Sequence, residues 1–496
     1  MTPADDSHGD IEQRLRGAIR TGQLVDLRQG DTTADAAARG GEWGARRTVP
    51  AVLLADLLTR GDGPDQPRAL RLAGARIAGR LDLEAAHLVC PVLLLGCWFD
   101  ESVALIEATV PALRLPGCHL PALDAEQLTT RGNVDLGRGF HARGEVNLGG
   151  AHIGGSLSLD GATLSNPGGR ALYADRLTVD QAMLCQEGFS VHGAVHLEGA
   201  HVGGSLRLKG AILSNPGGYA LYARRLTVGH NMACQGFSVH GEVDLEGARI
   251  GGGLVLDRAT LTGPDRVALI LVGLRARTLF LRELAQPPDK VVLVGAQVGT
   301  LLDDPASWPR TIDLSAFTYD SLFERFPVSA RQRLDWLGRN PRGYSPQPYE
   351  QLASVYRRAG RDQDARTVAI AKQRARRRTL PLPIRVWSLL LDALIGYGYR
   401  TWQAGLWLLG FWLAGWMVFA GAYPGSLTPA KPGEPQPAFQ PLVYSLDSLL
   451  PVVNLHQEDS WLPRGGAQWW AWSSILVGWV LTAAVAAAFT GVLKRD

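Results

Sequence analysis

One hydrophobic spacing recurs in four stretches of this chain and constrains the fold more than any other feature. Aliphatic residues follow one another at intervals of 5, 6 and 5 residues, and similar small residues surround them each time. Such self-similarity indicates a solenoid, in which each repeat buries its apolar side against the next. The four sets are Leu72, Ile77, Leu83 and Leu88; Leu148, Ile153, Leu159 and Leu164; Leu197, Val202, Leu208 and Leu213; and Leu245, Ile250, Leu256 and Leu261.

The local pattern around these residues predicts short β-strands. Triplets such as Leu81-Asp82-Leu83 alternate apolar and polar residues, and glycine or alanine separates them. Short strands between tight corners favour a right-handed, pentapeptide-like β-helix over residues 66–304. The 6-residue step departs from a strict pentapeptide pattern, so the cross-section of the β-helix stays open.

A second, longer period of 48 to 49 residues includes two copies of the string SNPGG. The copies lie at Ser165–Gly169 and Ser214–Gly218. Asn-Pro-Gly-Gly is typical of turns. We expect the two loops to project from equivalent edges of the stack, with Asn166 and Asn215 as candidate contacts for a protein partner.

Helical patterns flank the repeats. Residues 1–65 are predicted to form a helical cap over the open end of the solenoid. Residues 305–380 are predicted to form a helical adaptor, with a tetratricopeptide-like hairpin broken at Gly360. The first residues are acidic and polar, without an apolar signal region, so we expect the first domain to fold in the cytosol.

Two long stretches in the last quarter of the chain carry no charged residue. Each exceeds the roughly 20 residues that a helix needs to cross a bilayer. We therefore expect a membrane domain over residues 381–496, with transmembrane helices at Trp402–Tyr423 and Trp469–Leu493 and an external loop over residues 424–466. Tryptophans near the ends of both stretches are typical of the membrane interface.

Basic residues predict the orientation in the membrane. They concentrate before the first span and after the second, whereas the intervening loop has only Lys431 and Arg464. This asymmetry favours a plasma or inner membrane protein with both termini in the cytoplasm. The main basic cluster either contacts anionic lipid or simply determines topology. It consists of Arg374, Arg376, Arg377 and Arg378.

The external loop contains a short apolar run followed by polar residues. This layout resembles the helix, pore loop and helix of small cation channels, whose filters use backbone carbonyls or acidic rings. The alternative is an amphipathic segment that packs on the spans or on the lipid surface, and whether the loop re-enters the membrane stays open. The candidate pore residues are Asp447, Asn454, His456, Glu458 and Asp459.

Histidines recur in the repeats, at His152 and His201 and again at His192 and His240. Stacked histidines can bind a metal. The third copy, however, has Arg249 at the position of His152, and Arg76 is assigned to the same position in the first set. A position that accepts arginine favours a solvated surface, so we predict no metal site.

No motif for catalysis or cofactor binding is present in the sequence. It has no Walker loop, no GxSxG, no CxxC and no GxGxxG that opens a helix. Five cysteines are predicted to be small buried residues in a reduced solenoid. The net charge of +3 gives no global field for nucleic acid. We therefore predict no catalytic residue, no cofactor and no nucleic-acid partner.

The whole chain resembles a family of actinobacterial membrane proteins with pentapeptide-like repeats and two C-terminal spans. The strings that carry the resemblance are RRTVPAVLLADLLTRG, GAHIGGSLSLDGATL, WSLLLDALIGYGYR and YSLDSLLPVVNLHQEDSW. The resemblance implies the same architecture, and members are often labelled membrane-associated oxidoreductases.

Three functions follow as hypotheses. The first is a membrane-anchored cytoplasmic solenoid that acts as a scaffold or sensor for a protein partner, without a catalytic site. The second is a homo-oligomeric, channel-like pore formed by the two-span domain. The third is the membrane-associated oxidoreductase that the resemblance implies.

Overall fold

The computed structural model describes most of the chain, in two compact units that are treated separately below. The first unit comprises Met1–Gly360 and the second Arg361–Asp496. The described residues are 3–59, 67–263, 267–323, 328–382, 384, 385, 389, 392, 402–431, 437–450 and 452–493.

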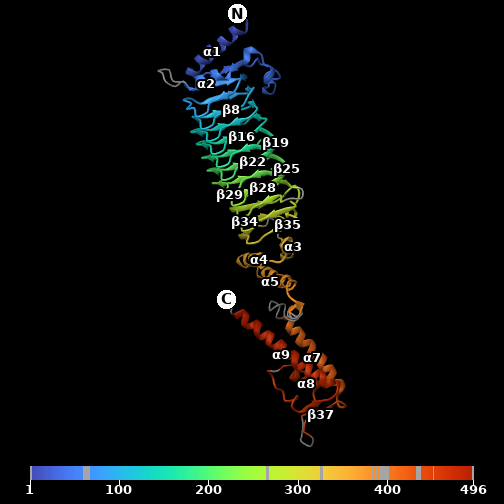
Figure 1. Ribbon diagram of the computed structural model, residues 1–496. Helices are drawn as coiled ribbons and strands as arrows, with labels where there is room; N and C mark the ends of the chain where they lie inside the picture. Colours follow the sequence, from blue (N-terminus) through green and yellow to red (C-terminus); the bar gives the residue numbers. More distant parts are fainter. Residues whose placement is uncertain are drawn as a thin grey trace. The chain divides into compact units, whose positions relative to one another are not determined.

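The first unit is a β-solenoid of about 11 turns, built from parallel strands (Figure 1). Each coil in the middle of the stack contains four two-residue strands, joined at tight corners. In one coil these are β10 (Leu113–Arg114), β11 (His119–Leu120), β12 (Leu123–Asp124) and β13 (Thr129–Thr130). Two of the strands belong to a 19-stranded sheet and two to a 17-stranded sheet. The solenoid prediction is confirmed, and the coil has four short sides.

The pattern of 5- and 6-residue intervals repeats every half coil, because the two halves of a coil have similar sequences. The strand pairings align Leu157 with Val134, Leu113, Val92 and then Leu70. Leu159 is therefore equivalent to Leu72, and the set that begins at Leu72 is half a coil out of phase with the other three.

This phase difference corrects one sequence assignment. Arg76 lies in β4 (Arg76–Ala78) and pairs with Trp98 in the 17-stranded sheet. His152 lies in β17 (His152–Ile153) of the 19-stranded sheet. The two residues therefore occupy different faces, although the same spacing surrounds both.

The longer period of 48 to 49 residues corresponds to two coils of unequal length. Leu157 aligns with Met183 and Met183 with Leu206, so the first coil has 26 residues and the second 23. The longer coil contains the SNPGG string at Ser165–Gly169. This loop is an insertion between two sides of the coil, and it adds the extra residues.

The core of the solenoid is a stack of aliphatic side chains, and all five cysteines are buried within it as free thiols. This confirms the prediction that the cysteines act as small buried residues. Tight corners need glycine where backbones approach closely. At Gly229, for example, a Cβ atom would collide with the carbonyl oxygen of Gly203 in the preceding coil.

Two helices lie in the N-terminal segment before the solenoid, α1 (Pro3–Thr21) and α2 (Ala51–Thr59). This segment also contributes strands. β1 (Val25–Asp26) pairs with β3 (Leu70–Ala73), and β2 (Thr48–Pro50) pairs with β4. The cap therefore continues the sheets rather than only covering them.

At the other end, the solenoid extends past the predicted boundary at residue 304. β35 (Thr311–Asp313) and β36 (Thr318–Leu322) pair in register with earlier coils. The helices α3 (Ala330–Gly338) and α4 (Pro346–Arg358) follow. α4 ends before Gly360, and α5 (Asp362–Arg377) begins after it.

A buried ion pair joins α3 to the last coils. Two nitrogens of the fully buried Arg333 donate to the carboxylate of Asp303, at 2.5 and 2.7 Å. The indole nitrogen of Trp308 donates to the same carboxylate at 2.8 Å, and the guanidinium lies over the rings of Trp308 and Trp336. Asp303 thus connects a solenoid strand, a loop and a helix.

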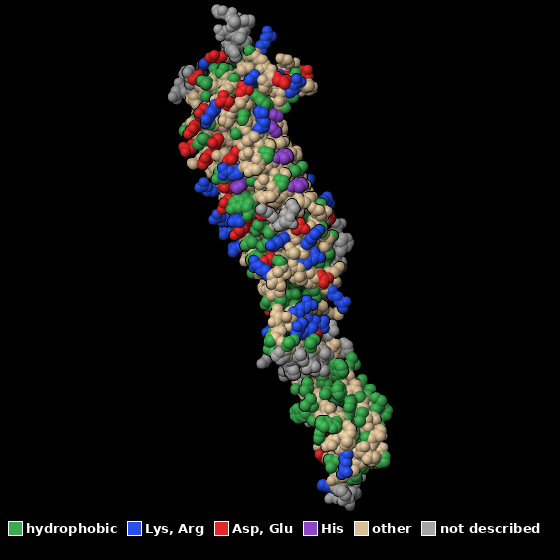
Figure 2. All heavy atoms as spheres, turned by 45° about the vertical axis from the view of Figure 1, so that its right-hand side comes forward, with side chains coloured by type: hydrophobic (Ala, Val, Ile, Leu, Met, Phe, Trp, Pro, Cys, Tyr) green, Lys and Arg blue, Asp and Glu red, His purple; other side chains and the backbone are tan. Residues whose placement is uncertain are grey.

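The elements of the second unit include the helices α5, α7 (Trp402–Ala422), α8 (Pro441–Leu449) and α9 (Gly466–Leu493). In the part of the chain that the structure describes, one helix, Gln403–Ala422, is long and apolar enough to cross a membrane. Much of the surface around it is hydrophobic (Figure 2). The string WSLLLDALIGYGYR, which carries part of the family resemblance, lies largely outside the described residues.

The short helix α8 packs against both long helices. A Cβ atom at Gly415 of α7 would collide with Ser445, and one at Gly478 of α9 would collide with the backbone of Leu449. The hydroxyl of Ser445 donates to the carbonyl of Trp412 at 2.9 Å. Glycines on α7 and α9 therefore allow α8 to lie in close contact with them.

Candidate functional site

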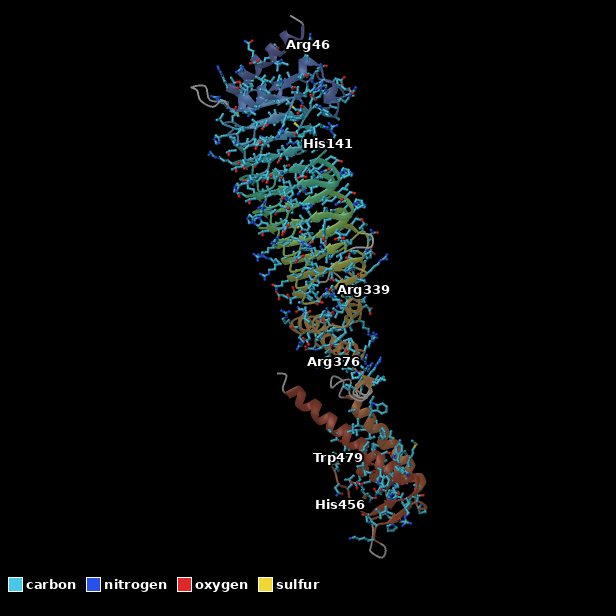
Figure 3. The ribbon with its side chains drawn as sticks, viewed as in Figure 1. Arg46, His141, Arg339, Arg376, His456 and Trp479 are labelled. Atoms are coloured by element: carbon cyan, nitrogen blue, oxygen red, sulfur yellow. The ribbon has the colours of Figure 1, made fainter. Side chains whose placement is uncertain are left out.

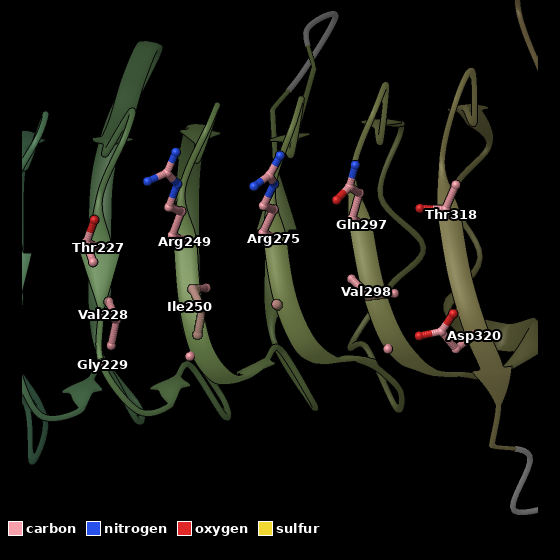
Figure 4. A pocket seen from close by; sticks show the side chains of 13 residues that line it. Thr227, Val228, Gly229, Arg249, Ile250, Arg275, Gln297, Val298, Thr318 and Asp320 are labelled. Atoms are coloured by element: carbon pink, nitrogen blue, oxygen red, sulfur yellow. The ribbon is translucent and has the colours of Figure 1, made fainter.

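An open groove of about 630 Å³ crosses five neighbouring coils of the solenoid (Figure 4). One row of its lining comes from consecutive strands of the 19-stranded sheet, in direct register. These strands are β26 (Thr227–Val228), β29 (Arg249–Val255), β32 (Arg275–Leu281), β34 (Gln297–Asp303) and β36. The row consists of Thr227, Arg249, Arg275, Gln297 and Thr318.

The hollow shape of the groove has a structural cause. Two residues after the row, three of the five strands carry a glycine, at Gly229, Gly251 and Gly299. A Cβ atom at Gly251 would collide with the carbonyl oxygen of Gly229 in the preceding coil. Close packing between these coils therefore requires glycine at these places, whereas Arg277 and Asp320 stand at the equivalent places on the other two strands. The surface beside the row lacks side chains at three of its five strands.

The charge of the groove has no such structural cause. Arg249 and Arg275 are exposed, lie on neighbouring strands and point the same way (Figure 4). The earlier coils carry Thr129, His152 and Thr178 in the same row. The fold therefore accepts neutral side chains at this position, and two successive arginines are a particular feature of the groove.

Neither arginine has an ion-pair or hydrogen-bond partner among the residues that the structure describes. In an earlier coil, the ring of His152 lies 3.4 Å from the carboxylate of Asp180, which is on the next strand. The residue at the corresponding place is Arg277 for Arg249 and Gly299 for Arg275. Asp180 therefore has no acidic counterpart beside either arginine, and the two cations are available to an outside anion.

The sequence reasoning noted Arg249 only as a substitute for histidine and missed this site. The relevant signal is the second arginine 26 residues later, at Arg275, together with glycine at Gly251 and Gly299. That signal becomes visible once the coil lengths are known.

The repeated histidines do not come together in the structure. Thr178 separates His152 from His201, and Ser214 separates His192 from His240, because each pair is two coils apart. Within the described ranges, no group of three or more His, Cys, Asp or Glu side chains is arranged to hold a metal ion.

Another pair of histidines does stack, and the sequence analysis missed it. The rings of His119 and His141 lie 5.1 Å apart on successive coils, and Trp98 stacks on the other side of His119. His141 is labelled in Figure 3. Burial, together with the charges of His141 and Arg143, lowers the pKa of His119 to about 4. The ring of His119 is therefore neutral at physiological pH.

The SNPGG loops lie at equivalent places on two coils, with one coil between them. β19 (Thr163–Tyr173) and β25 (Ile212–Tyr222) each pair with β22 (Ser190–His196). The side chain of Asn166 donates to the carbonyl of Arg170 at 2.7 Å, and that of Asn215 donates to the carbonyl of Tyr219 at 2.8 Å. Both amides hold their own loops closed.

Of the candidate pore residues, Asp447 is buried in α8 and already has its partners. Its carboxylate accepts hydrogen bonds from the backbone N–H groups of Leu455, Gln457 and Glu458, at 2.7, 2.9 and 2.9 Å. Asp447 therefore holds the following loop against the helix, as an N-cap residue holds the first turn of a helix.

The other four candidates lie in that loop. His456 and Asn454 contact each other, with 2.6 Å between the ring Nδ1 and the amide oxygen, and Asn454 is 3.5 Å from Asp459. His456 is labelled in Figure 3. Glu458 and Asp459 line a hollow of about 660 Å³ beside Arg464. Burial raises the pKa of Glu458, and the neighbouring carboxylates of Asp447 and Asp459 raise it further.

The basic cluster is partly neutralised within the second unit. Arg374 and Arg377 both bind the carboxylate of Asp392, at 2.9 and 3.2 Å. Arg376, labelled in Figure 3, and Arg378 are exposed. The cluster therefore presents fewer available charges than its sequence indicates.

Comparison with known proteins adds no relative to this description. No family model matches the sequence, and neither the curated proteins nor the solved structures give a significant match. The fold and the groove define the class: a β-solenoid joined in one chain to a helical unit whose α7 is long and apolar enough to cross a membrane.

Proposed function

We propose that the chain is a membrane-anchored β-solenoid that acts as a scaffold or sensor for a protein partner. The observation that carries the proposal is the open groove with two adjacent arginines that have no ion-pair or hydrogen-bond partner among the described residues. α7 supports the membrane anchor, because large apolar side chains on it are exposed. A long repetitive surface is typical of proteins that bind other proteins.

The finer features belong to the same proposal. We propose that the coils are right-handed and pentapeptide-like, as in the actinobacterial family that the sequence resembles. We also propose that α9 is a second span and that both termini lie on the cytoplasmic side of the plasma or inner membrane. Under this topology Arg376 and Arg378 face anionic lipid headgroups, where each basic residue contributes roughly 1 kcal/mol.

A homo-oligomeric pore is the second candidate function, favoured by the position of α8. A short helix held between two long ones by Gly415 and Gly478 resembles the plan of small cation channels. Since Asp447 is engaged with backbone amides, Glu458 is the better candidate for contact with an ion. Two helices per chain cannot enclose a pore, so this function requires several copies.

The test is one sample of the full chain in detergent, measured by light scattering and visible absorbance. The scaffold proposal predicts a colourless monomer or dimer. A colourless ring of four or more copies would favour the pore and would justify single-channel recording. A coloured sample would reject both and favour the oxidoreductase that the family resemblance implies.

The anchor itself is tested by flotation. The full chain, expressed in bacteria, should float with membranes after an alkaline carbonate wash, because a spanning helix is not removed by charge neutralisation. Release by the wash would contradict the proposed span.

A further inference from the structure

We propose that the groove binds an extended, acidic segment of the partner protein, seated along the row from Thr227 to Thr318. This inference rests on the proposed scaffold function and names the chemistry of the partner. It follows from the shape of the groove, the charge of its row and the glycines beside three of the five residues of that row.

The shape of the groove fits an extended chain. Neighbouring strands in a sheet lie about 4.8 Å apart, so a row of five strands measures about 19 Å from first to last. An extended peptide rises about 3.3 Å per residue, so roughly six residues cover the row. The groove is open to solvent along its length, which lets a longer chain enter at one end and leave at the other.

The charge of the row selects an acidic segment. Arg249 and Arg275 are long side chains on adjacent strands, and both guanidinium groups are free of partners within the described residues. A guanidinium binds a carboxylate through two parallel hydrogen bonds, which lysine cannot match. Acidic side chains two residues apart on an extended peptide face the same way, so both arginines can be satisfied together.

The far end of the row gives the binding a direction. Gln297 and Thr318 continue the row with an amide and a hydroxyl. Asp320 lines the groove at this end and pairs with Arg358 at 3.6 Å. We therefore expect the acidic residues of the peptide beside Arg249 and Arg275, and neutral polar residues beside Gln297 and Thr318.

The glycines explain how the backbone of the peptide can approach. Because Gly229, Gly251 and Gly299 have no side chains, the surface beside the row is low at these three strands. Two arginines are too few for tight binding of nucleic acid, whose affinity depends on many phosphate contacts.

The experiment uses the full chain in detergent and fluorescence anisotropy with a labelled hexaglutamate peptide. The wild-type chain should bind hexaglutamate and should not bind hexaglutamine. The double variant R249Q/R275Q should weaken binding at least tenfold, because hydrogen bonds to charged groups are the strong ones in such a contact. R207Q is the matched control, since Arg207 is also exposed on the 19-stranded sheet and lies outside the groove. It should change the affinity less than twofold.

Three results would overturn the inference: no binding of hexaglutamate, equal loss in R207Q and R249Q/R275Q, or displacement by inorganic phosphate at the same concentration as unlabelled hexaglutamate. The last result would identify a simple anion site. If hexaglutamate does not bind and the chain is a colourless monomer or dimer in the membrane, this inference fails and the scaffold proposal stands. Conversely, a ring or a coloured sample rejects the scaffold function whatever the peptide does.

Discussion

Two halves of one row on the solenoid behave differently. Between Thr129 and His201, the row carries threonine and histidine, and His152 has an acid opposite it on the next strand. From Thr227 to Thr318, the same positions carry two arginines without such an acid. The residues of the row stay paired through both halves, but the strands that carry it have two residues in the first half and seven in β29, β32 and β34. Both the side chains and the strand lengths therefore differ.

The comparison separates what the coil requires from what it leaves free. Aliphatic stacking and corner glycines recur in both halves because a coil cannot close without them. The exposed row varies because many side chains fit there. Arg249 and Arg275 occupy positions in this row that the fold leaves free, and no acid lies beside them on the next strand. These two arginines are therefore evidence for a binding surface.

The largest expected effect concerns the buried ion pair between Asp303 and Arg333, which joins the arginine-bearing half of the solenoid to α3. Asp303 lies in β34, the strand that also carries Gln297, and its partner Arg333 is fully buried. Asp303→Asn should lower the free energy of unfolding by about 3–5 kcal/mol, since it leaves a buried cation without its partner. Thermal unfolding followed by circular dichroism measures this.

The double variant D303L/R333M is the control for that prediction. Replacing both charges with apolar groups of similar volume should recover much of the lost stability. If the double variant is no more stable than Asp303→Asn, the loss of stability does not come from a buried cation without its partner.

The next effect concerns the corner glycines, which the comparison assigns to the fold. Gly251→Ala places a Cβ atom against a carbonyl oxygen of the preceding coil and should cost about 1–3 kcal/mol. Gly44→Ala is the matched control, because no atom lies within 4 Å of the new Cβ there. Equal melting temperatures for the two variants would show that the glycine is not required.

The asparagine loops should give a smaller effect. Asn166→Ala removes the hydrogen bond to the carbonyl of Arg170 and should cost about 1 kcal/mol. Asn215→Ala should behave alike, because the second loop has the same bond. A partner that loses affinity for both variants while their melting temperatures stay at the wild-type value would instead favour a direct contact role for these side chains.

The smallest effect is a pH dependence in the first half of the solenoid. The pKa of His119 is about 4 in the folded chain, below the ordinary 6.5, so protons bind the unfolded chain more readily. Stability should therefore fall as the pH drops from about 6.5 toward 4. His119→Gln should flatten this dependence in melting curves at pH 7 and pH 5, whereas His201→Gln, at an exposed position, should keep it. An unchanged slope in His119→Gln would assign the effect to other groups.

The periodic features of this molecule could be predicted from the sequence, and the features that depend on register could not. The solenoid, its helical ends and the break at Gly360 follow from spacing and composition. The same spacing fits two registers half a coil apart, which is why Arg76 was assigned to the wrong face. The groove depends on which strands are neighbours, and the role of Asp447 depends on amides 8 to 11 residues away in an irregular loop.

The most direct test of the central claim is a pair of values for R249Q/R275Q: its free energy of unfolding and its affinity for hexaglutamate, measured on the same preparation of the full chain. The account predicts stability within about 0.5 kcal/mol of wild type, as for surface substitutions in general, together with at least a tenfold loss of affinity. Stability and affinity that fall together, or an affinity that does not change, would contradict it.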